Sequence, residues 1–250
     1  MRIQVVSDIH LEEKVQLPCI VPLSDTLFLA GDIGTLGVNL YESFIDYCSK
    51  SWDTVFYVLG NHELYSKTKP INELVEDYKI FFGKYHNIVL LEHSKCQYNG
   101  YQIIGCTFWG DFSGDKHVSA SPKKIKVREN GDLVPIGGDK LTKLNITSQK
   151  WVLENIHAVL PTIILTHFPL MLESDKVRQD RYRNEDQNIL REYGTDMGLA
   201  SEDKIVCISG HTHFSHDFHK NGVRYISNQF GYEYEVKNGC CNYKEASYNL

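Results

Sequence analysis

Short apolar runs recur along the first half of the chain and alternate with segments of helical periodicity. Each run is continuous, which is typical of strands buried on both faces of a sheet. Between the runs, apolar residues recur every three or four positions, as on the buried face of a helix. Strands are expected at residues 1–7, 26–30, 54–59 and 88–91, and helices at 40–50 and from Pro70 to Phe82. This order predicts a layered α/β fold.

Four Asn-Gly pairs punctuate the chain from residue 99 onwards. The dipeptide is a strong short-range signal for a tight hairpin turn. The pairs lie at 99–100, 130–131, 221–222 and 238–239. Because hairpins join antiparallel strands, we expect a sheet of mixed direction in this part of the chain.

The rest of the second half gives two further buried strands and a peripheral segment. The strands are expected at 162–166 and 204–209, with helices at 147–158 and near 186–199. We interpret residues 109–143 as a peripheral hairpin insertion over or beside the site, and 170–186 as a charged surface loop. Because the chain contains no linker, low-complexity tract or internal repeat, we expect residues 1–250 to form a single domain.

Side chains able to bind a metal follow five of the buried runs. The five clusters are Asp8-Ile9-His10, Gly31-Asp32, Gly60-Asn61-His62-Glu63, Thr166-His167 and Gly210-His211-Thr212-His213. In open α/β sheets ligands gather at the carboxyl ends of the strands, so one edge of the fold would collect all five. Residues two apart, such as Asp8 and His10, face the same way on an extended chain and reach one point. An isolated Asp-x-His or Gly-Asp is a chance pattern, but five such clusters in order predict one active site.

The residue types indicate a pair of divalent metal ions. Carboxylates together with imidazoles suit Mn, Fe, Zn or Co better than Mg or Ca. No cysteine is among the candidates, which argues against a structural zinc site. The candidate ligands are Asp8, His10, Asp32, Asn61, His167, His211 and His213. Seven side chains are too many for one tetrahedral ion, whereas two ions that share a carboxylate use them all. Such a pair holds a hydroxide, orients a phosphate and stabilises both apical oxygens of an in-line displacement.

The series of clusters resembles the calcineurin-like metallophosphoesterase superfamily. The segments Cys106–Phe112 and Asn228–Tyr232 resemble its small stand-alone bacterial-type branch. The resemblance rests on Asp-x-His, Gly-Asp, Gly-Asn-His-Glu, Thr-His and Gly-His-Thr-His, which run from residue 8 to 213. It implies a four-layer α/β/β/α sandwich of two mixed sheets flanked by helices, with the site at one edge.

The resemblance also implies a role for each ligand. It assigns Asp8, His10 and His213 to one metal, and Asn61, His167 and His211 to the other. Asp32 would bridge the two ions. His62 would face the substrate as a general acid or transition-state donor, and we expect Glu63 to orient His62 or a ligand.

These observations predict a dinuclear metal-dependent phosphoesterase. It would hydrolyse a phosphomonoester or phosphodiester by attack of a metal-bound hydroxide, with Asp32 and His62 as catalytic residues. One alternative is a scaffold of the same fold that has lost its chemistry, although such a protein would be expected to lack His62 or part of the ligand set. A nuclease is a second alternative, because a phosphodiester is also a phosphoester.

The composition of the chain limits which binding partners and which cellular location we expect. The net charge of −6 weighs against long nucleic acid and leaves a mono- or dinucleotide open, beside other small phosphoester substrates. No apolar run approaches the roughly 20 residues that span a bilayer, so we expect no membrane partner. Seven scattered cysteines without a C-x-x-C pair indicate reduced thiols and a cytoplasmic location. The sequence leaves open the native metal, the ester class and the oligomeric state.

Overall fold

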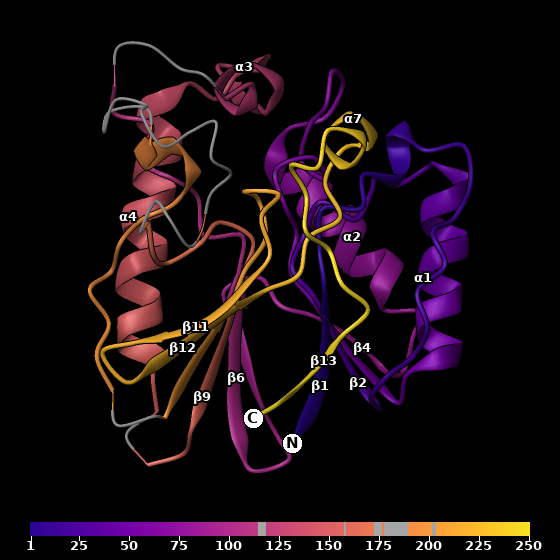
Figure 1. Ribbon diagram of the computed structural model, residues 1–250. Helices are drawn as coiled ribbons and strands as arrows, with labels where there is room; N and C mark the ends of the chain where they lie inside the picture. Colours follow the sequence, from indigo (N-terminus) through magenta and orange to yellow (C-terminus); the bar gives the residue numbers. More distant parts are fainter. Residues whose placement is uncertain (115–118, 158, 173–176, 178–189, 202–203) are drawn as a thin grey trace.

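The computed structural model has two mixed sheets packed against each other between layers of helices (Figure 1). It describes all residues except 115–118, 158, 173–176, 178–189 and 202–203. Layered α/β architecture with two mixed sheets was predicted from the sequence and is confirmed. Among the described residues, no helix is both long and apolar enough to cross a membrane.

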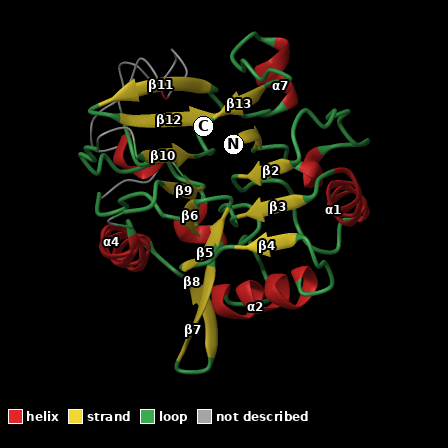
Figure 2. Cartoon of the chain, turned by 90° about the horizontal axis from the view of Figure 1, so that it is seen from below, coloured by secondary structure: helices red, strands yellow, loops and turns green. Residues whose placement is uncertain are grey.

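The first sheet is built mainly from the N-terminal part of the chain. Its order is β13-β1-β2-β3-β4, and β13 (Ser247–Asn249) pairs antiparallel with β1 (Arg2–Val6). The other strands, which run parallel to β1, are β2 (Thr26–Leu29), β3 (Thr54–Tyr57) and β4 (Ile88–Leu90). The helices α1 (Asn39–Ser51) and α2 (Ile71–Phe82) lie beside this sheet (Figure 2).

The second sheet has the order β11-β12-β10-β9-β6-β5. Its strands are β5 (Ser94–Tyr98), β6 (Tyr101–Cys106), β9 (Thr162–Thr166), β10 (Ile205–Ile208), β11 (His216–Lys220) and β12 (Val223–Ser227). The inner four are parallel, whereas the hairpins β5–β6 and β11–β12 are antiparallel. Their turns are the Asn-Gly pairs at 99–100 and 221–222, as predicted. The helix α4 (Gly138–Asn155) lies against the outer side of this sheet (Figure 1).

Side chains that point alternately to the two faces of each strand form the apolar layers on both sides of the sheets. In β1, Ile3 and Val5 belong to an apolar cluster between the sheets, which Ile103 and Ile163 of the second sheet also enter. Val6 instead joins the cluster that includes the helices. Because successive side chains of a strand point to opposite faces, a continuous apolar run supplies both clusters at once.

The segment between β6 and α4 differs from the expected insertion. It contains α3 (Ser121–Lys124) and the hairpin of β7 (Lys126–Glu129) and β8 (Asp132–Pro135), which turns at 130–131. The interpretation of residues 109–143 as peripheral was wrong at its end, because α4 already begins at Gly138 and runs to Asn155. The early turns of α4 bury Asn145, whose amide donates hydrogen bonds to the Trp109 carbonyl and to Thr195. A buried polar position of this kind conceals the apolar helical pattern.

Two other local expectations were wrong. Of the helix expected near 186–199, Leu190 is helical, but a 3-10 turn at Arg191–Tyr193 follows it and 194–199 is irregular. Residues 186–189 of that expected helix lie outside the described residues. The Asn-Gly pair at 238–239 follows the short helix α7 (Glu233–Lys237), where Gly239 takes a φ of 68°. A left-handed glycine is a common helix terminator, so this pair ends a helix and does not make a hairpin.

Candidate metal centre

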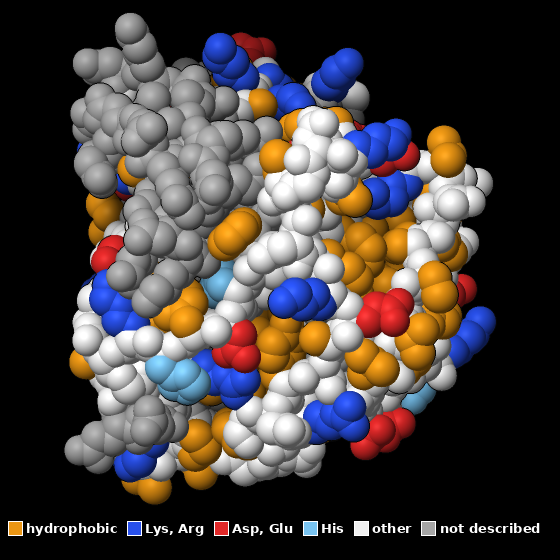
Figure 3. Space-filling model, in the orientation of Figure 1, with side chains coloured by type: hydrophobic (Ala, Val, Ile, Leu, Met, Phe, Trp, Pro, Cys, Tyr) orange, Lys and Arg blue, Asp and Glu red, His pale blue; other side chains and the backbone are white. Residues whose placement is uncertain are grey.

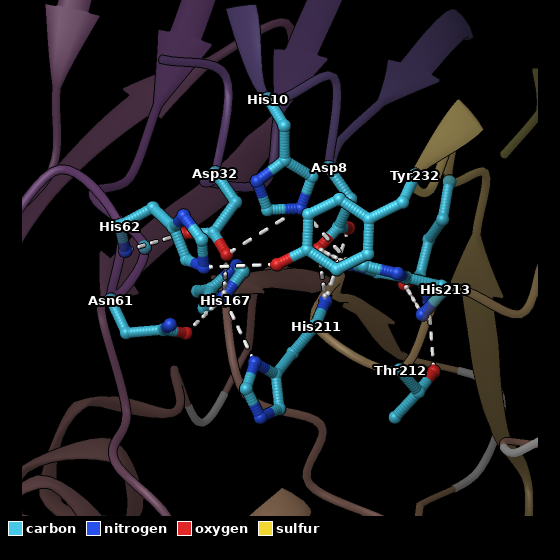
Figure 4. A network of polar contacts seen from close by, with 12 residues as sticks. Asp8, His10, Asp32, Asn61, His62, His167, His211, Thr212, His213 and Tyr232 are labelled. Carbon is cyan, nitrogen blue, oxygen red and sulfur yellow. Dashed lines mark hydrogen bonds and ion pairs between the residues drawn. The ribbon is translucent and has the colours of Figure 1, made fainter. Parts of the chain in front are cut away.

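All five clusters lie together at the edge where β1, β2, β3, β9 and β10 end (Figure 4). Three groups of side chains place their ligand atoms within 4.8 Å of one another. They are Asp8 with His10 and His213, Asp32 with His167 and His211, and His10 with Asp32 and His62. Asn61 adjoins the second group, because its Oδ1 lies 3.0 Å from Nε2 of His167. The structure therefore brings together all seven candidate ligands and His62.

Asp32 lies between the first two groups. Its Oδ2 is 3.4 Å from Nε2 of His167 and 4.0 Å from Nε2 of His10. Its Oδ1 accepts the backbone N–H of His62 at 2.8 Å. One carboxylate oxygen thus faces both groups, which is the position that a bridging ligand requires.

Five of the candidate ligands have a left-handed backbone, which the sequence did not predict. The φ values are 54° at Asp8, 54° at His10, 52° at Asp32, 75° at His211 and 54° at His213. This conformation is uncommon for residues other than glycine and clusters at functional sites. The expectation that each Asp-x-His or His-x-His pair lies on extended chain was wrong. The side chains of Asp8 and His10 still converge, because the chain turns sharply at each of these two residues.

Two glycines before these ligands leave room for the carboxylates. A Cβ at Gly60 would lie 2.2 Å from Oδ1 of Asp32, and one at Gly210 would lie 2.6 Å from Oδ2 of Asp8. Contacts this short do not occur in folded proteins, so a side chain at either position would displace a carboxylate. The glycine that precedes the ligand in Gly-Asn and Gly-His is thus a packing requirement of the site.

The ring nitrogens of His10 and His213 point at each other across the first group. Their Nε2 atoms are 3.1 Å apart, while each Nδ1 faces a carboxylate. Nδ1 of His10 is 3.3 Å from Oε1 of Glu12, and Nδ1 of His213 is 2.5 Å from Oε2 of Glu235. Because the carboxylates accept hydrogen bonds from Nδ1–H, the Nε2 lone pairs are the ones that converge. This is the arrangement that metal-binding histidines adopt.

The second group repeats the arrangement with a backbone partner. Nδ1 of His167 donates to the carbonyl of Ala30 at 2.8 Å, so its Nε2 faces the oxygens of Asn61 and Asp32. The amide of Asn61 donates to the Tyr65 hydroxyl at 2.8 Å, which directs its oxygen to the group. Burial lowers the pKa of His167, but the charge and hydrogen bond of Asp32, together with Asp8 and the Ala30 carbonyl, outweigh burial and raise that pKa to about 9. Positive charge is therefore favoured at this point, and a bound cation would supply it.

Glu63 holds two of the loops together. Its carboxylate accepts the backbone N–H groups of Asp32, Ile33 and Gly60, each at 2.9 Å, and the Tyr57 hydroxyl at 2.6 Å. Burial and the charge of Asp32 raise the pKa of Glu63 to about 7. Of the two roles expected for Glu63, the structure supports the orientation of a ligand, through the backbone of Asp32.

His62 lies beside the metal-binding groups with both ring nitrogens engaged. Nδ1 is 2.8 Å from Oε1 of Glu12, and Nε2 is 3.1 Å from the hydroxyl of Tyr232. Burial lowers the pKa of His62, but Asp32 and Glu12 outweigh it and leave the pKa raised. Burial raises the pKa of Glu12, and the hydrogen bonds from His10 and His62 reverse this effect and bring it to about 2.

Three side chains that contact the candidate ligands were given no role in the sequence-based prediction. Glu12 and Glu235 hold the Nδ1 atoms of His10 and His213, and Tyr232 stacks on His10 with ring centroids 4.4 Å apart. Glu12 stands two residues after His10, which is a usable signal. Glu235 and Tyr232 are in the C-terminal segment, where no metal-type cluster drew attention to them.

The site opens into a cavity of about 310 Å³. Ligands from both groups reach its wall, among them Asp32, Asn61, His211 and His213. His62 and Tyr232 also line it, together with Lys124 from the segment before β7. His216 and His219, which could have reached a substrate from β11, do not line it, and Nδ1 of His216 bonds the Phe214 carbonyl.

The layered α/β fold and the cluster of histidines and carboxylates at its edge are typical of metal-binding proteins. Residues 1–215 match the family model of the calcineurin-like phosphoesterases. A mimivirus relative, "Uncharacterized protein L509" of Acanthamoeba polyphaga mimivirus, is 31% identical over 262 residues, which cover 93% of this chain and 92% of that protein. The chain belongs to the calcineurin-like phosphoesterase family, as the resemblance of its motifs predicted.

A solved structure shares the fold over almost the whole chain. It is the phosphopantetheinyl hydrolase PptH of Mycobacterium tuberculosis, with a TM-score of 0.67 and 18% identity. The match covers 94% of this chain and 91% of that one. Identity at this level shows the common fold alone. Family membership supports a hydrolase, and the candidate metal groups fit the divalent ions that the family implies.

Proposed function

We propose that this protein is a dinuclear metal-dependent phosphoesterase that hydrolyses small phosphomonoesters or phosphodiesters. In this proposal Asp8, His10 and His213 hold one ion, and Asn61, His167 and His211 hold the other, with Asp32 between them. The ions would be Mn, Fe, Zn or Co, as the mixture of imidazole and carboxylate favours. The proposal includes one domain over residues 1–250 and a cytoplasmic location.

One observation carries the proposal: atoms that can bind a metal converge at two adjacent points. Nε2 of His10 faces Nε2 of His213, and Nε2 of His167 faces the Asn61 oxygen. In each case the other ring nitrogen is already hydrogen-bonded to a carboxylate or carbonyl, and buried acceptors do not face one another without a donor or a cation. The residues present therefore fit two cations.

When bound, two such ions would activate a water as the nucleophile and neutralise charge on the phosphoryl oxygens. The protein would supply the geometry. Glu63 fixes the backbone of Asp32, and Glu12 fixes the ring of His62. His62 lines the cavity beside Asp32, which supports the proposal that it assists the leaving oxygen of a substrate.

Small substrates fit the site better than long nucleic acid. The cavity volume of about 310 Å³ is at the low end for ligand pockets. On the face drawn in Figure 3, Lys and Arg side chains are scattered among acidic and apolar ones and form no continuous basic stripe outside the grey parts. A surface that follows a nucleic-acid backbone is typically basic along its length.

The test is a screen of metal-free protein after reconstitution with each of the four ions. Substrates would be p-nitrophenyl phosphate, its bis ester, cyclic nucleotides, dinucleotides and a phosphopantetheinyl ester, the last because of the shared fold with PptH. We expect two ions per chain by elemental analysis and turnover of at least one small ester. Two bound ions without turnover of any ester would favour the scaffold. Failure to bind any of the ions would refute the metal centre itself.

A further inference from the structure

The cavity contains a phenol whose position is fixed by the same residues that form the metal centre. Tyr232 precedes α7 and has no counterpart among the five clusters. It lines the cavity with His62 and Asp32, and its ring lies in front of the ligands in Figure 4. Tyr232 therefore lines the same cavity that a phosphoester would enter.

The backbone at Tyr232 is tied to the candidate ligands. Gly231 donates its N–H to the Asp8 carbonyl at 3.0 Å, and Tyr232 donates its own to Oε2 of Glu235 at 2.9 Å. That same carboxylate oxygen holds Nδ1 of His213. Gly231 has a φ of 73°, and a Cβ there would meet Sγ of Cys241 at 2.2 Å. The hydrogen bonds to Asp8 and Glu235 and the close packing at Gly231 therefore fix the backbone conformation at Tyr232.

Two histidines fix the plane of the phenol ring. The ring stacks on His10 with centroids 4.4 Å apart and an interplanar angle of 27°. It meets His213 edge to face, with centroids 4.7 Å apart. Both histidines belong to one candidate metal group, so the hydroxyl is held at a set position relative to any ion in that group.

The hydroxyl has a hydrogen-bonding capacity that its protein partner does not use up. Among the described residues its hydrogen-bond partner is Nε2 of His62, at 3.1 Å. A phenol donates one hydrogen bond and accepts others. When His62 donates to the phenolic oxygen, the phenolic hydrogen is directed into the cavity. A phenol has an ordinary pKa of about 10, so the hydroxyl keeps its hydrogen at neutral pH.

We infer that Tyr232 is a catalytic residue that contacts the substrate, and that its hydroxyl donates a hydrogen bond to a non-bridging phosphoryl oxygen. This inference rests on the proposed function, since it requires a phosphoryl group at the metal centre. The donor acts where negative charge grows in the transition state. Nε2–H of His62 orients the phenol in the free site and turns to the leaving oxygen when an ester binds. No proton is transferred to or from Tyr232.

The test is Tyr232→Phe, which removes the hydroxyl and keeps the ring that stacks on His10. We expect both ions to remain bound and kcat to fall roughly 10²-fold, the low end of the loss for one such donor. The loss should be the same for p-nitrophenyl and alkyl esters, because a phosphoryl contact does not depend on the leaving group. Tyr243→Phe is the matched control, since Tyr243 stacks on Phe230 and does not line the cavity.

A second measurement does not depend on turnover. Inorganic phosphate should bind the metal-loaded Tyr232→Phe protein about tenfold more weakly than the unaltered protein, as the loss of one hydrogen bond to an anion predicts. Unchanged phosphate affinity and kcat would refute the inference, and loss of an ion would show that Tyr232 only supports His10. A loss of rate confined to alkyl esters would make Tyr232 a leaving-group donor and overturn the phosphoryl contact. Absence of turnover in the unaltered protein would count against the proposed function, and the phosphate measurement would still test Tyr232.

Discussion

The two halves of the metal centre support their histidines in different ways. In the half formed by Asp8, His10 and His213, the Nδ1 atoms of both histidines are hydrogen-bonded to carboxylates. These are the half-buried Glu12 and the buried Glu235. In the other half, His167 gives Nδ1 to a backbone carbonyl, and the amide of Asn61 replaces an anionic ligand. A carboxylate behind an imidazole raises its basicity more than a carbonyl does. We therefore expect the first half to bind its ion more tightly than the second.

The difference shows that the ligands alone do not set the properties of the two positions. The halves differ in one ligand, Asp8 against Asn61, and also in the groups that hydrogen-bond to Nδ1 of their histidines. The first half depends on side chains that a substitution can alter. The support of His167 comes from the backbone of Ala30, which a substitution leaves in place.

Asp32 is the residue that the two halves share, so its replacement should have the largest effect. Asp32→Asn removes the negative charge between both groups, and we expect turnover to fall to background with weaker binding of both ions. Asp217→Asn is the control, because Asp217 is a surface carboxylate paired with Arg224. Near-normal turnover of Asp32→Asn at saturating metal would show that Asp32 does not bridge.

His62 stands beside both halves and should affect rate without affecting metal. His62→Ala, or His62→Gln, is expected to lower turnover by roughly 10²–10⁴ with both ions retained. The loss should be greatest for alkyl esters and smaller for p-nitrophenyl esters, whose leaving group departs without a proton. The exposed His219→Ala serves as the control. A loss of metal in His62→Ala would make His62 a ligand.

Glu235 tests the comparison directly. Glu235→Gln should weaken the ion at Asp8, His10 and His213 by about 10–100-fold and leave the other ion unchanged, as measured by metal retention against a graded chelator. Glutamine at this position preserves the cap of α7, because its amide oxygen still accepts the Tyr232 N–H. Glu233→Gln on the same helix is the control, since Glu233 is exposed and paired with Lys237. Equal weakening of both ions would remove the distinction between the halves.

Glu63 should give the smallest effect, on stability more than on chemistry. Glu63→Gln replaces an acceptor of three backbone N–H groups by an amide with one oxygen, and we expect the free energy of unfolding to fall by about 1–3 kcal/mol. Tyr57→Phe removes one of the four donors and should cost less, about 1 kcal/mol. Urea denaturation of the metal-free proteins measures both. If Glu63→Gln were as stable as the unaltered chain, its network would not hold the loops of Asp32 and Asn61 together.

The sequence by itself determined the central strands of the sheets and the identity of the clusters. Continuous apolar runs gave the buried strands, because a strand with a layer on each face needs apolar side chains on both. Gly-Asp, Gly-Asn-His-Glu and Gly-His-Thr-His stand directly after such runs, so the edge of the fold where they would meet followed from the sequence. The start of α4 did not follow from the sequence, because the N-terminal half of this helix buries a hydrogen-bonded Asn145 in place of an apolar residue.

Only the tertiary structure decided how the clusters become a site. The hydrogen bond of Tyr232 to His62 joins residues 170 positions apart, and that of Glu235 to His213 joins residues 22 apart, and neither leaves a local pattern. The left-handed backbone of Asp8 and His213 is equally hidden, because these residue types favour other conformations and accept this one under the constraint of the surrounding fold. Side-chain type and local periodicity are properties of the sequence, whereas contacts between distant loops exist only after the sheets have packed.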